Sequence, residues 1–594
     1  MFFTEFNPMT AEEVARKLDA KGAPTGGGCG ALAGKRFSAC LEGEHAPRQL
    51  DYVFEDEKTL LCTENGESFK AAYGAISLGR LTLFTHLVPG KARAWHLILD
   101  RESGALTAFE TWFGTKAPIG IDLTGKNPPT GWREIPREVQ RQYYFGWADI
   151  GLGEKPEELH TTTSRIEGRG LHWKFSTGYE MLTFFPSVAF SAFVELGDRQ
   201  GGITVANPSD YMKIDDENYI YSRCEVEYSG KLWIEVMNFF DCAAIGLEFG
   251  FGEDDELVYD LHTAELKITG DAAHMENIGV NGDKEPPMAL KRFKGAKGAR
   301  LAYRPRDIDP PMTHEEALRH AAEEQHIFDM NAQSIMGSKH NLAISGALAG
   351  KQFRIRPDCE KHVAAPWTGE GGLVYEYDVL DEKRLRWRIG GGQWQEEQYI
   401  CFEPAKGLYL FSHMLTGDPD YANVTHAADF TNGLTTTVRA QIGNWHSEWE
   451  VGSQVRFGTL EYGDLRPPFA RRHHFTTELV GRSYAWNYSE MMNSIHIYTA
   501  PESYCWVILQ PDNSGGAMWS SPCWYVKLRD DAYLFQWVEE KCNGSQGLVV
   551  INPKILHDGG FFFGVSHSGL KLSITGAYGR ELGRYDILKY FGRK

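Results

Sequence analysis

The stretch "ALAGKRF" (residues 31–37) returns as "ALAGKQF" (residues 347–353) in the second half of a 594-residue chain. Each copy continues with related segments in the same order, such as "DEKTL" (residues 56–60) and "DEKRL" (residues 381–385). Self-similarity over so long a period indicates a duplicated module rather than a local motif. The chain is therefore expected to contain the same fold twice.

Each copy is followed by a second pair of related blocks. Residues 171–196, "LHWKFSTGYEMLTFFPSVAFSAFVEL", align without a gap on residues 484–509, "YAWNYSEMMNSIHIYTAPESYCWVIL". Further on, residues 230–251 are aligned on residues 531–552. The module thus has two parts, and the chain should hold four units. The expected boundaries are a helix and Gly-rich lead-in (1–30), unit 1 (31–150), unit 2 (151–280), a linker with a helix (281–340), unit 3 (341–465) and unit 4 (466–594).

Short segments rich in Tyr, Trp, Phe, Val and Ile alternate with turn signals along each unit. The turn signals include "TGDPD" (residues 416–420), "PDNSGG" (residues 511–516) and "HDGG" (residues 557–560). This pattern is typical of antiparallel hairpins. Many short strands in a small unit favour a sandwich or a closed barrel, and closure removes exposed sheet edges. The expected fold class is mainly β, with tandem antiparallel barrels.

Helix is expected only outside the units. "TAEEVARKL" (residues 10–18) begins with Thr10 and has Glu13 three positions later, which is a capping-box pattern. The segment 313–333 begins in the same way, with Thr313 and Glu316, and its apolar spacing suits packing along a barrel wall. Even the helical lead-in is therefore duplicated.

Composition excludes several classes of function. The formal charge of −19 provides no field that would attract nucleic acid, and the basic run at residues 291–300 is best interpreted as a solvated linker. No stretch approaches 18 apolar residues, and no secretion signal is recognisable, so we expect a cytoplasmic protein without a membrane segment. The ten cysteines form no C-x-x-C pair, and no spacing typical of a metal site occurs. No cofactor is therefore predicted, and a homo-oligomer is left open.

The second half resembles the family of molybdenum cofactor biosynthesis protein F (MoaF-like). The resemblance rests on "ALAGKQFRIR", "LVYEYDVLDEKRLRWRI" and "FTNGLTTTV" for the N-terminal domain of the family, and on "HHFTTELVGRSYAWNYSEMMNSIHIY" and "CWYVKLRDDAYLFQWVEEKC" for its C-terminal domain. It covers most of residues 341–580 and, more faintly, residues 31–275. The resemblance implies pairs of small lipocalin-like β-barrels.

Candidate site residues cluster in unit 4, where polar groups alternate with aromatic ones. His496 and Tyr498 lie two positions apart and should share a strand face, as should Tyr504 and Trp506, Tyr525 and Lys527, and Trp537 and Glu539. If these faces point inward, an acid–base site is expected, with catalytic His496, Glu539 and Lys527 and with Tyr498, Trp506, Tyr525 and Trp537 as binding residues. The alternative is that these aromatic residues are ordinary core and Glu539 is solvated.

The first half provides an internal comparison. In the alignments above, His496 corresponds to Thr183, Trp537 to Val236 and Glu539 to Asn238. Unit 2 is therefore expected to be degenerate, with the acid–base residues lost.

Units 1 and 3 share a different feature, a histidine at the end of a similar segment. It is His86 in "LFTH" of unit 1 and His413 in "LFSH" of unit 3. Each serves either a buried structural hydrogen bond or a ligand pocket. Three hypotheses follow: a cofactor-independent lyase or isomerase acting on an aromatic or apolar metabolite, a carrier of a hydrophobic or pterin-like molecule, and a fused dimer with one active half, which is compatible with both others.

Overall fold

The computed structural model describes residues 9–42, 47–114, 116–119, 131–134, 136–151, 155–187, 190–197, 204–225, 230–252, 254–273, 312–328, 338–361, 373–444, 447–489, 492–509, 518–539 and 544–592. Strands dominate these residues, and nearly all pair antiparallel with their neighbours. The expected fold class, tandem antiparallel β-barrels, is confirmed.

The first unit is a closed barrel of eight strands in the order β1-β10-β7-β6-β5-β4-β3-β2, and the hairpin β8–β9 is inserted between β7 and β10. The bounds are β1 (Arg36–Glu42), β2 (Arg48–Phe54), β3 (Thr59–Glu64), β4 (Glu67–Leu78), β5 (Leu81–Leu87), β6 (Arg93–Asp100), β7 (Ala105–Phe113), β8 (Lys116–Ile119), β9 (Gly131–Glu134) and β10 (Val139–Ala148).

The third unit closes in the plain order from β21 to β28, the up-and-down arrangement that lipocalins also use. The bounds are β21 (Gln352–Lys361), β22 (Tyr375–Val379), β23 (Arg384–Ile389), β24 (Gln395–Ala405), β25 (Leu408–Met414), β26 (Asn423–Asp429), β27 (Leu434–Ile442) and β28 (Val451–Glu461).

The strands of the second and fourth units are joined in one sheet. The second unit contributes β11 (Thr161–Thr162), β12 (Arg169–Phe175), β13 (Glu180–Phe184), β14 (Phe190–Leu196), β15 (Thr204–Lys213), β16 (Asn218–Cys224), β17 (Leu232–Asn238), β18 (Ala243–Phe251) and β19 (Leu257–Ala272). The fourth contributes β29 (His474–Phe475), β30 (Arg482–Ser489), β31 (Met492–Ala500), β32 (Ser503–Leu509), β33 (Met518–Arg529), β34 (Ala532–Val538), β35 (Gln546–Asn552), β36 (His557–Ser566) and β37 (Gly569–Tyr585).

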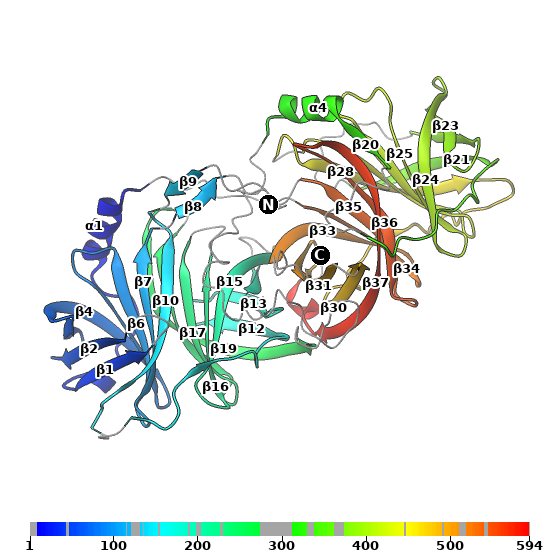
Figure 1. Ribbon diagram of the computed structural model, residues 1–594. Helices are drawn as coiled ribbons and strands as arrows, with labels where there is room; N and C mark the ends of the chain where they lie inside the picture. Colours follow the sequence, from blue (N-terminus) through cyan, green and yellow to red (C-terminus); the bar gives the residue numbers. More distant parts are fainter. Residues whose placement is uncertain are drawn as a thin grey trace.

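Four separate barrels were expected, and this expectation is wrong. The described strands form three large sheets, because the second and fourth units share a sheet of 19 strands that also includes β20 (Gln325–Ile327). Within it, β12 pairs with β19 and β30 pairs with β37, so the strands of each unit curl back on themselves. The units are continuous because β19 and β37 extend beyond these pairings and pair with each other. Figure 1 shows the second and fourth units at the centre of the molecule, between the first and the third.

The contact between β19 and β37 has the character of a dimer interface. These are the last strands of the two copies, and they pair antiparallel, with Gly270 opposite Tyr585 and Ala272 opposite Gly583. Pairing of a strand with its own equivalent is the isologous arrangement of a two-fold dimer. The arrangement agrees with the fused-dimer hypothesis.

The repeated "ALAGK" is a lead-in turn rather than part of a strand. Leu32 and Leu348 are buried in the cores of the first and third barrels. Gly34 and Gly350 have φ angles of 72° and 74°, a region that favours glycine. The first barrel strands begin only afterwards, at Arg36 and Gln352. The stretch is kept in both copies because a buried leucine and a left-handed glycine together fix the entry into each barrel.

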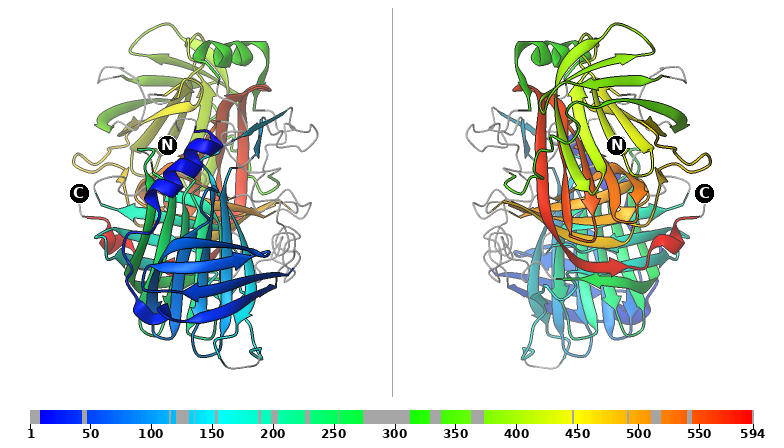
Figure 2. Two further views of the ribbon diagram at one scale, coloured as in Figure 1. Left: turned by 90° about the vertical axis from the view of Figure 1, so that its left-hand side faces the viewer. Right: turned by 90° about the vertical axis from the view of Figure 1, so that its right-hand side faces the viewer.

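Two α-helices occur among the described residues, and each covers the junction between the two units of its module. Helix α1 (Ala11–Lys21) and helix α4 (His314–Glu323) both have the expected capping boxes. Helix α1 packs into an apolar cluster that joins the first and second units, and α4 into one that joins the third and fourth. Figure 2 shows both helices on the outside of the barrels. Helix α4 is shorter than expected, because β20 follows it and pairs parallel with β37.

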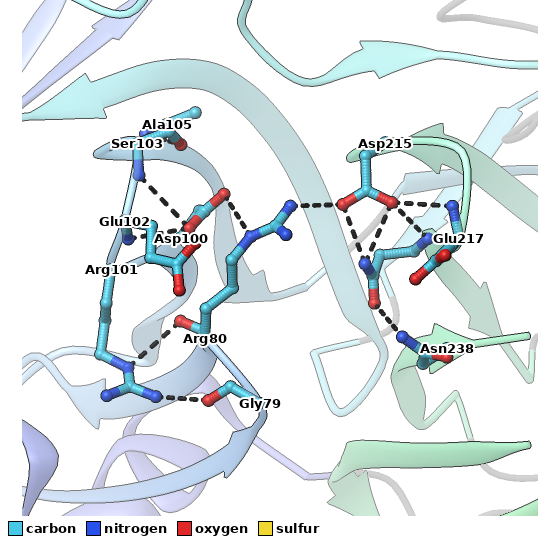
Figure 3. A network of polar contacts seen from close by, with 11 residues as sticks. Gly79, Arg80, Asp100, Arg101, Glu102, Ser103, Ala105, Asp215, Glu217 and Asn238 are labelled. Carbon is cyan, nitrogen blue, oxygen red and sulfur yellow. Dashed lines mark hydrogen bonds and ion pairs between the residues drawn. The ribbon is translucent and has the colours of Figure 1, made fainter. Parts of the chain in front are cut away.

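A polar network also holds the first and second units together (Figure 3). The guanidinium of Arg80 donates to Asp100 of its own barrel at 2.9 Å and to Asp215 of the second unit at 2.5 Å. Asp215 also accepts hydrogen bonds from the backbone and side chain of Asn218. A single arginine thus bridges the two barrels.

The expected turns and the basic run have different outcomes in the structure. "TGDPD" forms the expected turn, but "HDGG" lies inside strand β36 and is not a turn. "PDNSGG" and the basic run at residues 291–300 lie outside the described residues.

Candidate functional site

The inward face of the fourth unit is lined by a cluster of aromatic rings around one histidine. His496 lies with its ring centroid 5.1 Å from that of Tyr504 and 6.4 Å from that of Trp537. Tyr504 in turn packs edge-on against Phe535 at 4.9 Å. Alternate residues of successive strands point to the same side, which brings these side chains together. The aromatic cluster consists of Tyr484, Trp486, His496, Tyr498, Tyr504, Tyr525, Phe535 and Trp537.

His496 has an unusual environment for a polar side chain. It is 3% exposed, and its Nδ1 atom has no hydrogen-bond partner among the described residues. Burial lowers the pKa of the imidazole to about 3, so it is neutral at physiological pH. The neighbouring side chains of Tyr498 and Trp486 interact with each other. The Nδ1 atom of His496 is therefore a buried polar atom that is available to a ligand.

Glu539 stands beside the aromatic cluster, directly after β34. The indole Nε1 of Trp537 donates to its Oε1 at 2.6 Å. Burial raises the pKa of the Glu539 carboxyl to about 7, while this hydrogen bond acts in the opposite direction. The carboxyl can therefore exchange a proton near neutral pH.

Asp558 is a second buried carboxyl that the sequence analysis missed. It is 2% exposed and accepts a hydrogen bond from the backbone N–H of Ala577 at 2.7 Å. Burial raises the pKa of its carboxyl to about 8. It lies opposite Ile551 on β35 and Ala577 on β37, which belong to the same core cluster as the aromatic rings, so it borders the aromatic cluster. It was overlooked because "HDGG" was interpreted as a turn, although an Asp between β-forming segments and followed by small residues also suits a crowded strand.

Lys527, the third predicted catalytic residue, lies in a different setting. Its ammonium group pairs with Glu478 at 2.8 Å and with Asp530 at 3.2 Å. The hydrogen bond to Glu478 raises the pKa of Lys527. Tyr533 shares the same glutamate. These partners form a surface group at the end of β33, and the contacts of Lys527 are with them rather than with the aromatic cluster.

The predicted binding residues of unit 4 all line the same interior. Tyr498, Tyr525 and Trp537 belong to the aromatic cluster. Trp506 lies on the strand beside His496, directly opposite it in register, and donates from its indole nitrogen to Ser521 at 3.1 Å. The structure therefore brings His496, Glu539 and these four residues into one region.

His86 and His413 are inside the first and third barrels and have matching hydrogen bonds. Tyr52 Oη lies 3.1 Å from His86 Nε2, and Tyr377 Oη lies 3.1 Å from His413 Nε2. The other ring nitrogen, Nδ1, donates in each case to the carbonyl of the next residue. Burial lowers the pKa of both histidines to about 4. Because both ring nitrogens have partners, this geometry favours the structural alternative, and the predicted binding role stays a prediction.

In the third barrel the tyrosine–histidine hydrogen bond belongs to a longer series of hydrogen bonds. Tyr377 Oη also lies 2.6 Å from His426 Nε2, and His426 Nδ1 lies 2.9 Å from Thr437 Oγ1. Since Nδ1 of His413 donates to a carbonyl, the hydroxyl of Tyr377 donates to His413 and accepts from His426. His426 was missed because the corresponding position of the first copy carries an apolar residue, so the self-comparison gave no signal.

The alignment that made the second unit degenerate is off by one strand, because it set β34 against β17. Strands β16 and β34 are the fifth strands of their rings, and Lys213 faces Tyr219 as Lys527 faces Tyr533. Residues 211–225, "YMKIDDENYIYSRCE", and 525–539, "YVKLRDDAYLFQWVE", then align without a gap.

The corrected register changes the comparison between the two units. Trp537 corresponds to Arg223, and Glu539 to Glu225. Residue His496 still corresponds to Thr183, but the second unit keeps the carboxylate and gains a buried arginine. The second unit therefore retains ionisable side chains at positions equivalent to those of the fourth.

Two general features of the described residues concern function. No helix in this part of the chain is long and apolar enough to cross a membrane. No group of three or more His, Cys, Asp or Glu side chains placed to hold a metal ion occurs in the described ranges.

Comparison with known proteins agrees with the resemblance seen in the sequence. Residues 473–584 match the MoaF C-terminal domain. "Protein MoaF" of Klebsiella aerogenes is 25% identical over 206 residues, which are 32% of this chain and 72% of that protein. A crystal structure from Burkholderia vietnamiensis, provisionally described as a β-lactamase, is 23% identical and covers 20% of this chain and 95% of its own, with a TM-score of 0.15. That score carries no structural argument.

The matched segment 473–584 runs from β29 to β37 and so contains the aromatic cluster, His496, Glu539 and Asp558. The site described above therefore lies in the part of the chain that the MoaF C-terminal domain covers. The fourth unit therefore contains a MoaF C-terminal domain, and the chain is similar to the protein MoaF over 206 residues.

Proposed function

We propose that this protein is a cytoplasmic, cofactor-independent enzyme that binds a small aromatic or apolar metabolite in the fourth unit and acts on it by acid–base chemistry, as a lyase or isomerase. The observation that supports this most is the unpartnered Nδ1 of His496 inside the aromatic cluster. A buried polar atom without a partner costs about 1–3 kcal/mol, and a ligand hydrogen bond would recover this. The aromatic rings provide faces for an apolar, planar body.

Two carboxyls give the proposal its chemistry. Asp558, with a pKa of about 8, is mostly protonated at neutral pH and suits a proton donor. Glu539, with a pKa of about 7, can accept or release a proton. Neutral His496 orients the ligand through its free nitrogen. Two carboxyls whose pKa values lie near neutrality, beside one aromatic cluster, suit proton transfer at a carbon or oxygen atom.

A carrier is the second candidate. The pKa of about 3 makes His496 a weak base in the unliganded protein, which favours a role in hydrogen bonding over proton abstraction. A hydrophobic or pterin-like molecule would suit the aromatic cluster, and the resemblance to the family of molybdenum cofactor biosynthesis protein F motivates the pterin-like alternative.

The test begins with native mass spectrometry of the purified full chain, to detect a compound that co-purifies. That compound is then incubated with the wild type and with His496→Gln, Asp558→Asn and Glu539→Gln, and its conversion is followed by chromatography. We expect at least a hundredfold loss of conversion for Asp558→Asn. Lys174→Met, on the exposed side of β12, is the control and should retain conversion. Unchanged conversion in both carboxyl variants would exclude the enzyme, and tight binding without conversion would favour the carrier.

A further inference from the structure

The second unit has its own enclosed interior, distinct from the aromatic cluster of the fourth. One apolar cluster takes a side chain from each of the eight strands β12 to β19, and this defines the second-barrel interior: Trp173, Met181, Phe193, Tyr211, Tyr221, Trp233, Ala244 and Leu266. The neighbours Ile220, Ile234 and Leu247 instead pack outward, in the cluster shared with the first barrel. Residues two positions away from members of the interior cluster therefore also point inward.

Arg223 lies inside this barrel, where aromatic rings pack against its guanidinium group and some of its N–H groups lack partners. The side chain is fully buried, and the guanidinium carbon is 4.6 Å from the ring centroids of both Phe193 and Trp233. Within the described part of the chain, Nε and Nη1 have no hydrogen-bond partner, Nη2 has Glu225 at 3.5 Å, and the Tyr221 side chain also interacts with the guanidinium. Nearby tyrosines and Glu225 raise its pKa despite its burial, so it is charged. A buried cation with two unpartnered nitrogens is costly unless something else binds it.

Other polar atoms of the same interior are also unpartnered among the described residues. Both amide atoms of Asn207 are buried without partners, as is the hydroxyl of Thr183. Asn207 lies two positions from Val205 and four from Tyr211, both interior residues, and Thr183 lies two positions from Met181. Glu235 accepts from His262 at 2.9 Å through Oε1, but its Oε2 is free. The indole nitrogens of Trp173 and Trp233 are free as well.

The fold is able to satisfy a buried arginine where no ligand is needed. Arg141, buried between the first and second units, donates to Asp210 at 2.9 Å, to Ser222 at 3.1 Å and to Cys224 at 2.8 Å. Arg223 is as deeply buried but has fewer partners, Glu225 at 3.5 Å and the Tyr221 side chain. The difference indicates that the partners of its Nε and Nη1 atoms come from outside the chain.

We infer that the second-barrel interior is a binding site for a planar small molecule that carries a carboxylate. A guanidinium binds a carboxylate through two parallel hydrogen bonds, and Asn207 can donate a third. Phe193 and Trp233 hold the guanidinium plane fixed, which reduces the entropy lost on binding. The tyrosine and tryptophan rings contact the planar body, and Glu235 Oε2 accepts from a hydroxyl or amino group on it.

This inference is independent of the function proposed for the fourth unit. At the position of Arg223 the fourth unit has Trp537, which fills the space with an uncharged ring. The two interiors should therefore select by charge, a carboxylate in the second unit and a neutral aromatic compound in the fourth.

The test uses the full chain and two matched probes, naphthalene-2-carboxylate and its neutral amide, naphthalene-2-carboxamide, in calorimetric titrations at pH 7.5. We expect the carboxylate to bind at least tenfold more tightly than the amide. Arg223→Met should remove this preference, and Asn207→Leu should weaken carboxylate binding at least threefold. Lys174→Met, which removes an exposed positive charge from the same unit, should leave both affinities unchanged.

Folding of the variants does not limit this test. Thr183→Val and Asn207→Leu remove groups that make no hydrogen bond among the described residues, so both should fold even if Arg223→Met does not. Carboxylate binding that is no tighter than amide binding, or no measurable binding up to millimolar concentration, would overturn the inference. The inference would also be overturned if Asn207→Leu and Arg223→Met both left the affinity for the carboxylate unchanged. If Arg223→Met is unfolded, Arg223→Lys replaces it in this comparison.

Discussion

Arg529 of the fourth unit pairs with the fully buried Asp429 of the third at 3.6 Å, and the first module places its arginine on the opposite side of the same junction. There Arg80 belongs to the barrel of Asp100 and reaches across to Asp215. Asp100 and Asp429 are equivalent, since they lie opposite Leu81 and Leu408, the first residues of β5 and β25, which are the fifth strands of the first and third barrels. The two modules thus use one ionic contact with the partners exchanged.

Replacing these two arginines should affect stability unequally. Arg529→Met leaves the Asp429 carboxylate buried without its cation, which should lower the free energy of unfolding by about 3 kcal/mol. Arg80→Met should cost about 1 kcal/mol, because Arg80 is partly exposed and Asp100 keeps the backbone N–H groups of residues 102 and 103. Urea denaturation of the two variants measures the difference. Equal losses would contradict the assignment.

The tyrosine–histidine contacts of the first and third barrels allow two matched substitutions to be compared. Tyr377→Phe leaves two buried histidine nitrogens without a partner, those of His413 and His426, whereas Tyr52→Phe leaves only that of His86. The free energy of unfolding should therefore fall by about 2–4 kcal/mol for Tyr377→Phe and by about 1–2 kcal/mol for Tyr52→Phe. Thermal and chemical unfolding of both variants tests this order. A larger loss of stability for Tyr52→Phe would show that the hydrogen bonds from Tyr377 to the two histidines of the third barrel are not formed.

Asp558 should make stability fall as the pH rises. Its pKa is about 8 in the folded protein and 3.8 as the reference for the unfolded chain, so between these values the folded state holds one proton more. The wild type should lose about 1.4 kcal/mol per pH unit from this group in that window, and nothing further above pH 8. Asp558→Asn lacks this loss, so its stability relative to the wild type should increase from pH 5 to pH 8. Asp586→Asn, at an exposed position, is the control and should show no such trend.

Asn207→Leu should stabilise the unliganded protein. The amide of Asn207 is buried and both of its polar atoms lack partners in the described structure. Its replacement by an apolar side chain of similar size removes a desolvation cost of about 1–3 kcal/mol. Differential scanning calorimetry without added ligand should show a higher melting temperature than that of the wild type. A lower one would show that the amide is hydrogen-bonded in solution.

The duplication and the barrel class could be predicted from sequence because they depend on repeated local signals. The buried Leu32 and Leu348, the left-handed Gly34 and Gly350 and the capping boxes are all short-range features, and each was visible twice. The joining of the second and fourth units was not visible, because it depends on a few residues at the ends of β19 and β37 that pair across the whole chain.

The site was predicted in part, for a similar reason. Strand periodicity places His496, Tyr498 and Trp537 on shared inward faces. Lys527 has the same period, but it lies near the end of β33 and Glu478 binds its ammonium group. Asp558 was missed because adjacent glycines suggested a turn, although Gly560 is required in the strand because an added Cβ would lie 2.0 Å from the Leu548 carbonyl oxygen.

The pairing of β19 with β37 also has a consequence for synthesis on the ribosome. The first module emerges with the tail of β19 unpaired, and its partner strand β37 is translated only with the fourth unit. Until then this tail is a free strand edge, able to pair with the same tail of another nascent chain. Strand β37 therefore competes, within the same chain, with such swapped pairings of β19.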